Sequence, residues 1–286
     1  MYKYYYDCEN RLTEVNDIND APVASYKFDF AGRRVKKIVY GSPDVVRSYI
    51  YDGGQVVAEY DVNGTTFTLL RRFRYGPGID EPICMWRTAA GGGAGWFYYH
   101  YDGLGSVVAL SDVNGTIVES YEYDVFGEPT IYDYAAHQEV EESSVGNPYM
   151  FTGRRFDSET GLYYYRARYY EPYIGRFMSA DPLGTVPDDK NIGFEPTMQY
   201  EDGMNLYAYC RNNPVNYIDP EGKIFVWAYH CVRCFYSHRT SWNNVRKCRE
   251  RYPCDAQARW RCVVNNRNFN RLLHHCTKCA VGSWFI

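Results

Sequence analysis

The chain has no long apolar stretch. None of its 286 residues belong to a run that approaches the roughly 18 apolar residues of a membrane-spanning helix. Residues 1–7, MYKYYYD, lack the apolar core of a secretory signal peptide. We therefore expect no membrane span. The chain is cytoplasmic, leaves the cell by another route, or is the 3′ portion of a longer coding sequence. The last interpretation fits best, because repeated sequence begins at residue 2 without a capping element.

Cysteine is scarce in the first part of the chain and acidic residues are scarce in the last part. Residues 1–222 hold three scattered cysteines and carry 19 Lys/Arg against 33 Asp/Glu, a net charge of −14. Residues 223–286 hold seven cysteines and carry 12 Lys/Arg against Glu250 and Asp255, a net charge of +10. This asymmetry predicts two parts with different roles. The basic part favours an anionic partner, which is either external (nucleic acid or lipid) or the acidic part of its own chain.

Motifs of known nucleases and metalloproteases are also absent. The chain has no His-x-x-x-Asn-His-like motif and no zincin motif, and the pair His274-His275 is a weak signal by itself. The sequence therefore predicts neither a target nor an activity for the basic tail.

Tyrosine is the residue that stands out, with 31 copies in a chain that is 18% aromatic, alongside 24 Gly and 13 Pro. Aromatic residues suit a pleated, half-buried surface, and Gly and Pro mark turns, so the expected class is mainly β. Tyr-Asp or Phe-Asp pairs recur about every 20 residues, with wider gaps at loops, which indicates an internal repeat. We interpret each pair as a strand-to-turn junction; a carbohydrate-binding aromatic face is the alternative. Asn63-Gly64 and Asn114-Gly115 predict hairpin tips with type I′ turns.

The most distinctive block of sequence follows these repeats. It contains FTGRRFD (151–157), GLYYYRARYY (161–170), GRF (175–177), and the endings DPLG (181–184) and DPEG (219–222). With the Tyr-Asp repeats, it resembles the RHS/YD-repeat proteins, and more narrowly the RHS repeat-associated core domain. The resemblance covers roughly residues 1–222.

This resemblance implies a β-sheet strip wound into a hollow shell, with the core domain curled inside one end as a plug. A variable C-terminal region follows, often a toxin held inside, and related shells occur in polymorphic toxins, insecticidal toxin complexes and teneurins. About 220 residues supply only about ten to fifteen strands, too few to close such a cavity. We therefore expect part of a shell. It has a YD-repeat region at 1–150, a plug at 151–222, and a small Cys-rich, helical module at 223–286.

The resemblance also implies a function, which is a structural shell end that encloses or presents the C-terminal tail. Its partners would be that tail, the rest of an RHS shell, or an immunity protein. The chain would be secreted or attached to the cell surface as part of a longer protein. Binding of glycans or cell surfaces through the tyrosine-rich face is an alternative from another class.

A further alternative is an enzyme that acts on itself. In the family, aspartates of the first Asp-Pro and last Asp-Pro-x-Gly motifs are implicated in cleaving the chain after the core. These match Asp181 and Asp219, with Arg176 as a candidate orienting or charge-balancing residue and a cut after Gly222. Such chemistry needs two close carboxylates with separated pKa values. This sequence departs from the family pattern in two places. It has an insertion at 185–204, and it has Lys223 where the family often has an apolar residue. In the alternative interpretation both aspartates are only turn residues before proline.

The tail offers candidate metal ligands in two Cys-x-x-Cys pairs, Cys231 with Cys234 and Cys276 with Cys279. Four thiolates at this spacing suit a zinc ion, although a separation of 41 residues is long for a compact site. A disulfide scaffold and reduced structural cysteines are the other interpretations. Residues 241–252 predict one helix, and Asp255 caps a second that runs to residue 264.

Overall fold

The computed structural model describes residues 2–183, 200 and 203–227. By its contacts the chain divides into two units, Met1–Arg239 and Thr240–Ile286, and every described residue belongs to the first. The predicted helices of the tail and the candidate zinc ligands Cys231, Cys234, Cys276 and Cys279 lie outside the described residues. In the part that the structure describes, no helix is long and apolar enough to cross a membrane.

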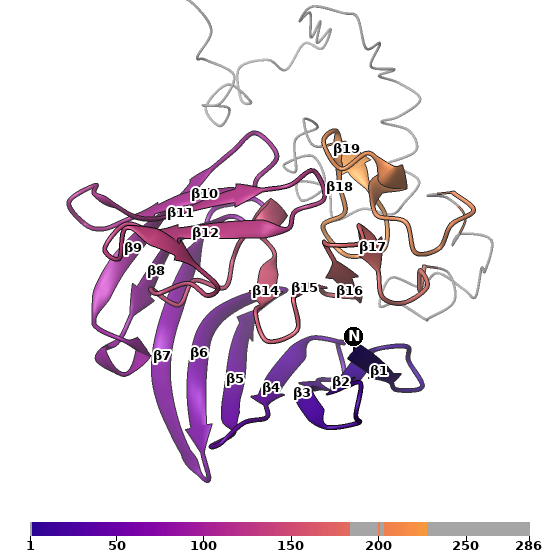
Figure 1. Ribbon diagram of the computed structural model, residues 1–286, viewed down its shortest axis with the longest axis horizontal. Coiled ribbons are helices and arrows are strands. Elements are labelled where there is room, and N and C mark those ends of the chain that lie inside the picture. The colour runs from indigo at the N-terminus through magenta and orange to yellow at the C-terminus, as the bar shows by residue number, and fades with distance from the viewer. Residues whose placement is uncertain (1, 184–199, 201–202, 228–286) are drawn as a thin grey trace, which may run out of the picture. The chain divides into compact units, whose positions relative to one another are not determined.

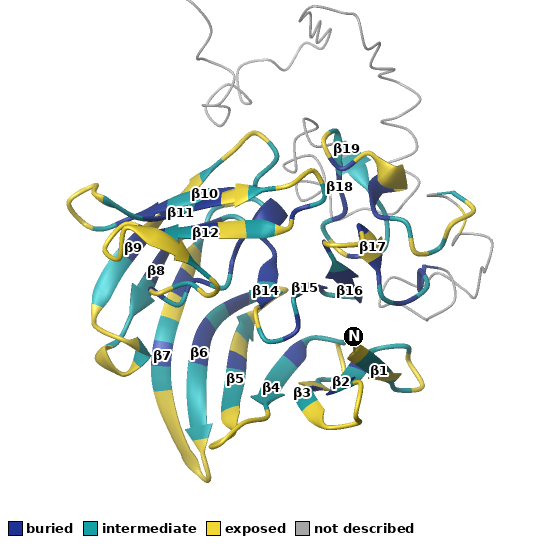
Figure 2. Cartoon of the chain, in the orientation of Figure 1, coloured by how far each residue is buried: buried dark blue, intermediate teal, exposed yellow. Residues whose placement is uncertain are grey.

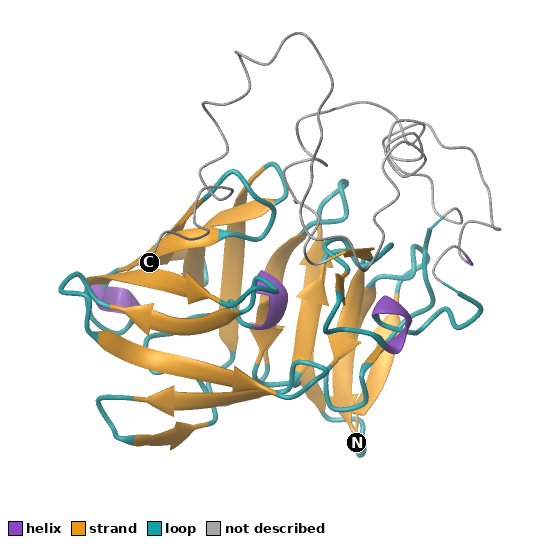
Figure 3. Cartoon of the chain, turned by 90° about the horizontal axis from the view of Figure 1, so that it is seen from above, coloured by secondary structure: helices purple, strands orange, loops and turns teal. Residues whose placement is uncertain are grey.

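The described chain is mainly antiparallel β, as the composition predicts (Figures 1 and 3). Thirteen strands form one sheet in which every strand pairs with its neighbours in sequence, an up-and-down order that short hairpin loops allow. We call this sheet the wall. Its strands are β1 (Tyr2–Tyr6), β2 (Leu12–Asp17), β3 (Pro22–Phe28), β4 (Arg34–Val39), β5 (Val45–Asp52), β6 (Gln55–Asn63), β7 (Thr66–Tyr75), β8 (Pro82–Arg87), β9 (Gly95–Tyr101), β10 (Val107–Ser111), β11 (Ile117–Tyr123), β12 (Pro129–Asp133) and β13 (Gln138–Val140).

A second block of structure follows the wall, and we call residues 151–183 and 203–227 the core block. It holds a four-stranded antiparallel sheet of β14 (Arg155–Asp157), β15 (Leu162–Tyr165), β16 (Arg168–Glu171) and β17 (Arg176–Phe177), and a pair of β18 (Tyr217–Ile218) and β19 (Val226–Trp227). Three short 3-10 helices complete the described elements: η1 (Ala89–Gly91), η2 (Phe151–Gly153) and η4 (Cys210–Asn212). The wall is curved, and β14–β16 lie on its concave side (Figure 1).

Four of the Tyr-Asp or Phe-Asp pairs, those of Asp7, Asp29, Asp102 and Asp124, lie where strands end and turns begin. In six loops an aspartate Oδ1 accepts hydrogen bonds from the backbone N–H groups two and four residues later: Asp7, Asp17, Asp29, Asp102, Asp112 and Asp124. The side chain thus replaces a backbone partner in the turn. Both predicted hairpin tips are present, but the type I′ prediction is wrong. Only Gly64 and Gly115 have positive φ (60° and 81°), whereas type I′ needs positive φ at both central residues.

Tyrosines near the ends of four strands, β5, β7, β9 and β11, tie each of these strands to the one before it. The hydroxyl of Tyr75 donates to Val56 O (2.7 Å), and that of Tyr123 donates to Val107 O (2.6 Å). Tyr51 and Tyr101 make the same bond to the strands that precede them, β4 and β8. Each ring therefore covers apolar surface while its polar end is satisfied within the wall.

Buried aromatic side chains join the wall to the core block, and Figure 2 shows the burial of β14–β16. Phe151, Tyr163, Tyr165, Tyr170, Phe177 and Tyr209 pack with wall residues in one cluster. Two of their hydroxyls hold the β11–β12 loop of the wall. Tyr163 donates to Gly127 O (2.9 Å) and Tyr170 to Phe126 O (2.7 Å). Fully buried tyrosines need such partners, and here the wall supplies them.

Three groups of ion pairs also connect the two parts. Arg34 and Lys37 of β4 bind Asp157, and Glu59 of β6 binds Arg155. Asp80, in the β7–β8 loop, binds Arg154 and Arg166. Burial by itself would raise the pKa of Asp157, but the charges of Arg34 and Lys37 outweigh it and lower that pKa to about 2. The carboxylate therefore stays charged in the core, where only paired charges are tolerated.

Candidate active site

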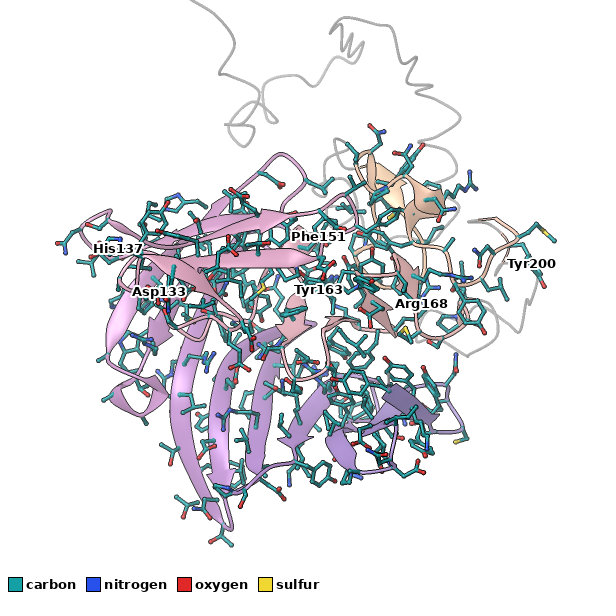
Figure 4. All side chains as sticks on the ribbon, in the orientation of Figure 1. Asp133, His137, Phe151, Tyr163, Arg168 and Tyr200 are labelled. Atoms are coloured by element: carbon teal, nitrogen blue, oxygen red, sulfur yellow. The ribbon has the colours of Figure 1, made fainter. Side chains whose placement is uncertain are left out.

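Arg168 is the centre of the candidate site. It begins β16 (Figure 4), directly after the two-residue turn Arg166-Ala167. It is buried, with its guanidinium 3.6 Å from the ring centroid of Phe177. One nitrogen, Nη2, lies 3.1 Å from Asp181 Oδ2 and 3.2 Å from Asp219 Oδ2. The two aspartates picked out by motif, 38 residues apart in sequence, are thus neighbours across a single arginine.

Asp219 lies in a loop of the same kind as those of the wall. Its Oδ1 accepts hydrogen bonds from the N–H groups of Glu221 (3.3 Å) and Lys223 (3.1 Å), which are two and four residues later, and also from Ile224 (3.2 Å). Its Oδ2 contacts Arg168 instead. One oxygen therefore builds the turn while the other belongs to the site, so a turn role does not preclude a chemical role.

The peptide bond between Gly222 and Lys223 is held at both ends. Gly222 O accepts a hydrogen bond from Arg168 Nε at 2.5 Å, and the N–H of Lys223 donates to Asp219 Oδ1 at 3.1 Å. A cationic donor on the carbonyl oxygen polarises that bond and would stabilise negative charge on the oxygen. The carbonyl oxygen and the N–H of this one peptide bond are therefore both bound by residues of the candidate site.

Gly222 occupies a position that no larger residue fits. Its φ is +66°, in the left-handed region, and a Cβ there would lie 2.4 Å from the backbone oxygen of Tyr165. Glycine is therefore required for the carbonyl to reach Arg168.

The carboxyl group of Asp181 has a raised pKa. Its Oδ1 accepts from the N–H of Leu183 at 2.8 Å, and its own N–H donates to Leu206 O at 3.1 Å. Burial raises the pKa of Asp181 to about 6, and the nearby charge of Asp219 adds to this, while Arg168 and the bond from Leu183 act in the opposite direction. A carboxylate with a pKa near 6 is an effective proton acceptor close to neutral pH.

Arg176 lies elsewhere. Its guanidinium donates to Asn205 Oδ1 (3.3 Å), stacks over Tyr207 with 5.8 Å to the ring centroid, and is exposed. The arginine that contacts both carboxylates is Arg168, which motif reasoning missed. The sequence held one signal for it. Arg166 and Arg168 flank Ala167 between two tyrosine-rich strands, and buried arginines beside such a turn need acceptors.

The described residues contain no group of three or more His, Cys, Asp or Glu side chains that could hold a metal ion. The carboxylate pair has Arg168 as a cationic partner. The zinc prediction concerns tail cysteines that lie outside the described part of the chain.

The structure combines a curved antiparallel wall, a tyrosine-rich block on its concave side and a buried carboxylate–arginine site. The chain therefore belongs to the class of mainly antiparallel β proteins. No protein-family profile matches the chain. The tRNA3(Ser)-specific nuclease WapA of Bacillus spizizenii is 36% identical over 228 residues, which are 79% of this chain and 8% of WapA. Toxin subunit YenC2 of Yersinia entomophaga is 36% identical over 125 residues, which are 43% of this chain and 11% of YenC2.

A solved structure has the same fold. The crystal structure of TcdB2-TccC3 matches 77% of this chain and 10% of that chain, with a TM-score of 0.56 and 23% identity. The chain thus spans about a tenth of the length of these proteins. It is related to a segment of large toxin proteins, in agreement with an RHS-associated, toxin-like domain.

Proposed function

We propose that residues 1–222 are the RHS repeat-associated core that ends a β shell, and that this core presents residues 223–286 and releases them by cutting its own chain after Gly222. The observation that carries the proposal is that one guanidinium contacts both carboxylates and the carbonyl oxygen of Gly222. The relatives are toxins and toxin subunits, which supports release of an effector-like tail. Other toxin components are the partners that this relationship suggests.

The reaction is hydrolysis of the Gly222–Lys223 peptide bond by one water molecule. Asp181 accepts a proton as the water oxygen attacks the carbonyl carbon, and Arg168 Nε stabilises the charge on the carbonyl oxygen. The carbon–nitrogen bond then breaks, and the nitrogen of Lys223 needs a proton. Asp181 returns to it the proton taken from water, while Asp219 accepts the hydrogen bond of the Lys223 N–H and keeps its ion pair with Arg168. The products are the carboxylate of Gly222 and the amine of Lys223.

Lys223 gives the site its backbone N–H, and the charge of Lys223 acts to lower the pKa of Asp181. Glycan or cell-surface binding stays a prediction. The tyrosines at the strand ends use their hydroxyls inside the wall, which leaves only ring surface for such a ligand.

Intact mass spectrometry tests the proposal. The wild-type chain should yield two species whose masses sum to that of the 33.4 kDa chain plus one water, with the break between Gly222 and Lys223. Asp219→Asn should give one uncut species, because the neutral amide loses the ion pair that orients Arg168 on the carbonyl of Gly222. Asp112→Asn is the matched control, since Asp112 makes the same turn bonds in the wall, and it should be cut as wild type. An uncut wild-type chain would refute self-cleavage.

The rate of cleavage should depend on pH through Asp181. Because this carboxyl acts as a proton acceptor, it must be deprotonated, so the rate should rise with pH, half-maximal near pH 6, and level off above pH 7. Below pH 6 the rate should fall about tenfold per pH unit. Pulse-labelled chain transferred to buffers between pH 4.5 and 8 gives the profile. A rate that falls as pH rises through 6 would assign Asp181 the opposite role, that of proton donor.

A further inference from the structure

The β15–β16 turn binds the segment that would be cut through three hydrogen bonds. Three consecutive residues of the turn bind three consecutive carbonyl groups. The guanidinium of Arg166 donates to Pro220 O, the N–H of Ala167 donates to Glu221 O (3.3 Å), and Arg168 Nε donates to Gly222 O (2.5 Å). Residues 220–222 therefore lie alongside the turn in a single register. This register fixes the position of the Gly222 carbonyl relative to Arg168.

This turn has a backbone conformation that is unfavourable without support. Arg166 has a φ of +59°, a left-handed conformation that is unfavourable for a residue with a Cβ. Such a residue stays in place only where its surroundings hold it. One part of the support for Arg166 is its bond to Pro220 O, and the other part comes from outside the core block.

The support from outside the core block is Asp80, in the β7–β8 loop of the wall. Its two carboxylate oxygens bind the two terminal nitrogens of Arg166, at 2.6 Å and 3.2 Å, a bidentate pair that fixes the plane of the guanidinium. The wall loop also approaches the core block closely. A Cβ on Gly153 would lie 2.2 Å from Asp80 O, and Arg154 binds the same carboxylate. The wall is therefore in direct contact with the residue that positions Pro220.

We propose that Asp80 is a positioning residue for the cleavage reaction. It acts through Arg166, so that the chain is cut only after the β7–β8 loop of the wall has docked on the core block. The inference rests on the proposed function, because it names the residue that couples self-cleavage to assembly of the wall. Misplacement by about 1 Å away from the reacting atoms can lower a rate by about 10²-fold, so a supporting contact of this kind has a measurable effect.

The experiment follows cleavage of the full-length chain during cell-free synthesis, with labelled chain chased and analysed over time. Asp80→Asn should slow first-order cleavage by about 10- to 100-fold, and Asp80→Glu, which keeps the charge, should restore most of the rate. Arg166→Met should match Asp80→Asn, and the double variant should be no slower than either single variant. The pH at half-maximal rate should stay that of wild type in all of them, because Asp181 and Asp219 are unchanged.

Glu59→Gln is the matched control for stability. Glu59 is also a buried wall residue paired with a core-block arginine, Arg155, at 2.7 Å. Its loss should lower the urea midpoint of the uncut Asp219→Asn protein at least as much as Asp80→Asn does, yet leave the cleavage rate of folded chains as in wild type. Equal slowing by both variants would mean that Asp80 acts only through stability, and wild-type cleavage in Asp80→Asn would also overturn the inference. If the wild-type chain itself is never cut, the proposed function fails instead.

Discussion

Arg168→Lys should lower the rate of self-cleavage by about 10²- to 10³-fold. The planar guanidinium binds Gly222 O through Nε while Nη2 binds both carboxylates, and an ammonium cannot reproduce this geometry from one nitrogen. Loss of one donor to a developing oxyanion costs about 10²- to 10³-fold in comparable sites. The measurement is the time course of cut and uncut species by intact mass.

Arg176→Lys is the control for that variant. Arg176 is exposed and contacts Asn205 and Tyr207, so its replacement should leave the rate within about twofold of wild type. If Arg176→Lys stopped cleavage and Arg168→Lys did not, the arginine chosen from the motif would be the functional one and the geometry around Arg168 would be incidental.

Arg34→Met should destabilise the protein by about 3–5 kcal/mol, because it leaves the buried carboxylate of Asp157 with Lys37, a cation that Asp157 shares with Glu159. Arg34 is fully enclosed, and its guanidinium lies 4.6 Å from the ring centroid of Tyr164 and 5.2 Å from that of Tyr26. Urea unfolding of the uncut Asp219→Asn protein, with and without Arg34→Met, measures the difference in unfolding free energy.

The neighbouring residue supplies the control. Arg33 pairs with Asp29 at the surface of the wall, with a third of its side chain exposed, and exposed pairs contribute about 0–1 kcal/mol. Arg33→Met should therefore change the unfolding free energy by less than about 1 kcal/mol. The double variant Arg34→Met with Asp157→Leu should recover much of the loss, since it removes both buried charges. No recovery would mean that Arg34 stabilises mainly through the surrounding rings.

Local patterns in the sequence predicted the hairpins well, because each junction depends on neighbours in the chain. Asp112, for example, bonds only to residues within its own loop. The turn type at Asn114-Gly115 was wrong for the same local reason, since the aspartate two residues earlier takes over the turn and leaves only the glycine with positive φ.

Long-range pairing could not be predicted in the same way. Asp181 and Asp219 were found by motif, but nothing near either residue indicates that Arg168 lies between them. That depends on the register of β15 with β16, in which Tyr165 faces Arg168 across the turn. Likewise Asp80 follows an unremarkable Gly-Ile pair, and its partner Arg166 lies 86 residues away.

The binding of residues 220–222 by the β15–β16 turn limits the number of times that one molecule can carry out the proposed reaction. The substrate segment is already bound by three consecutive contacts before the cut, and the new carboxyl group of Gly222 would stay beside Arg168 afterwards. The site is then occupied by its own product, so no second polypeptide can enter. Under the proposed function each molecule would therefore turn over once, with a half-life independent of protein concentration.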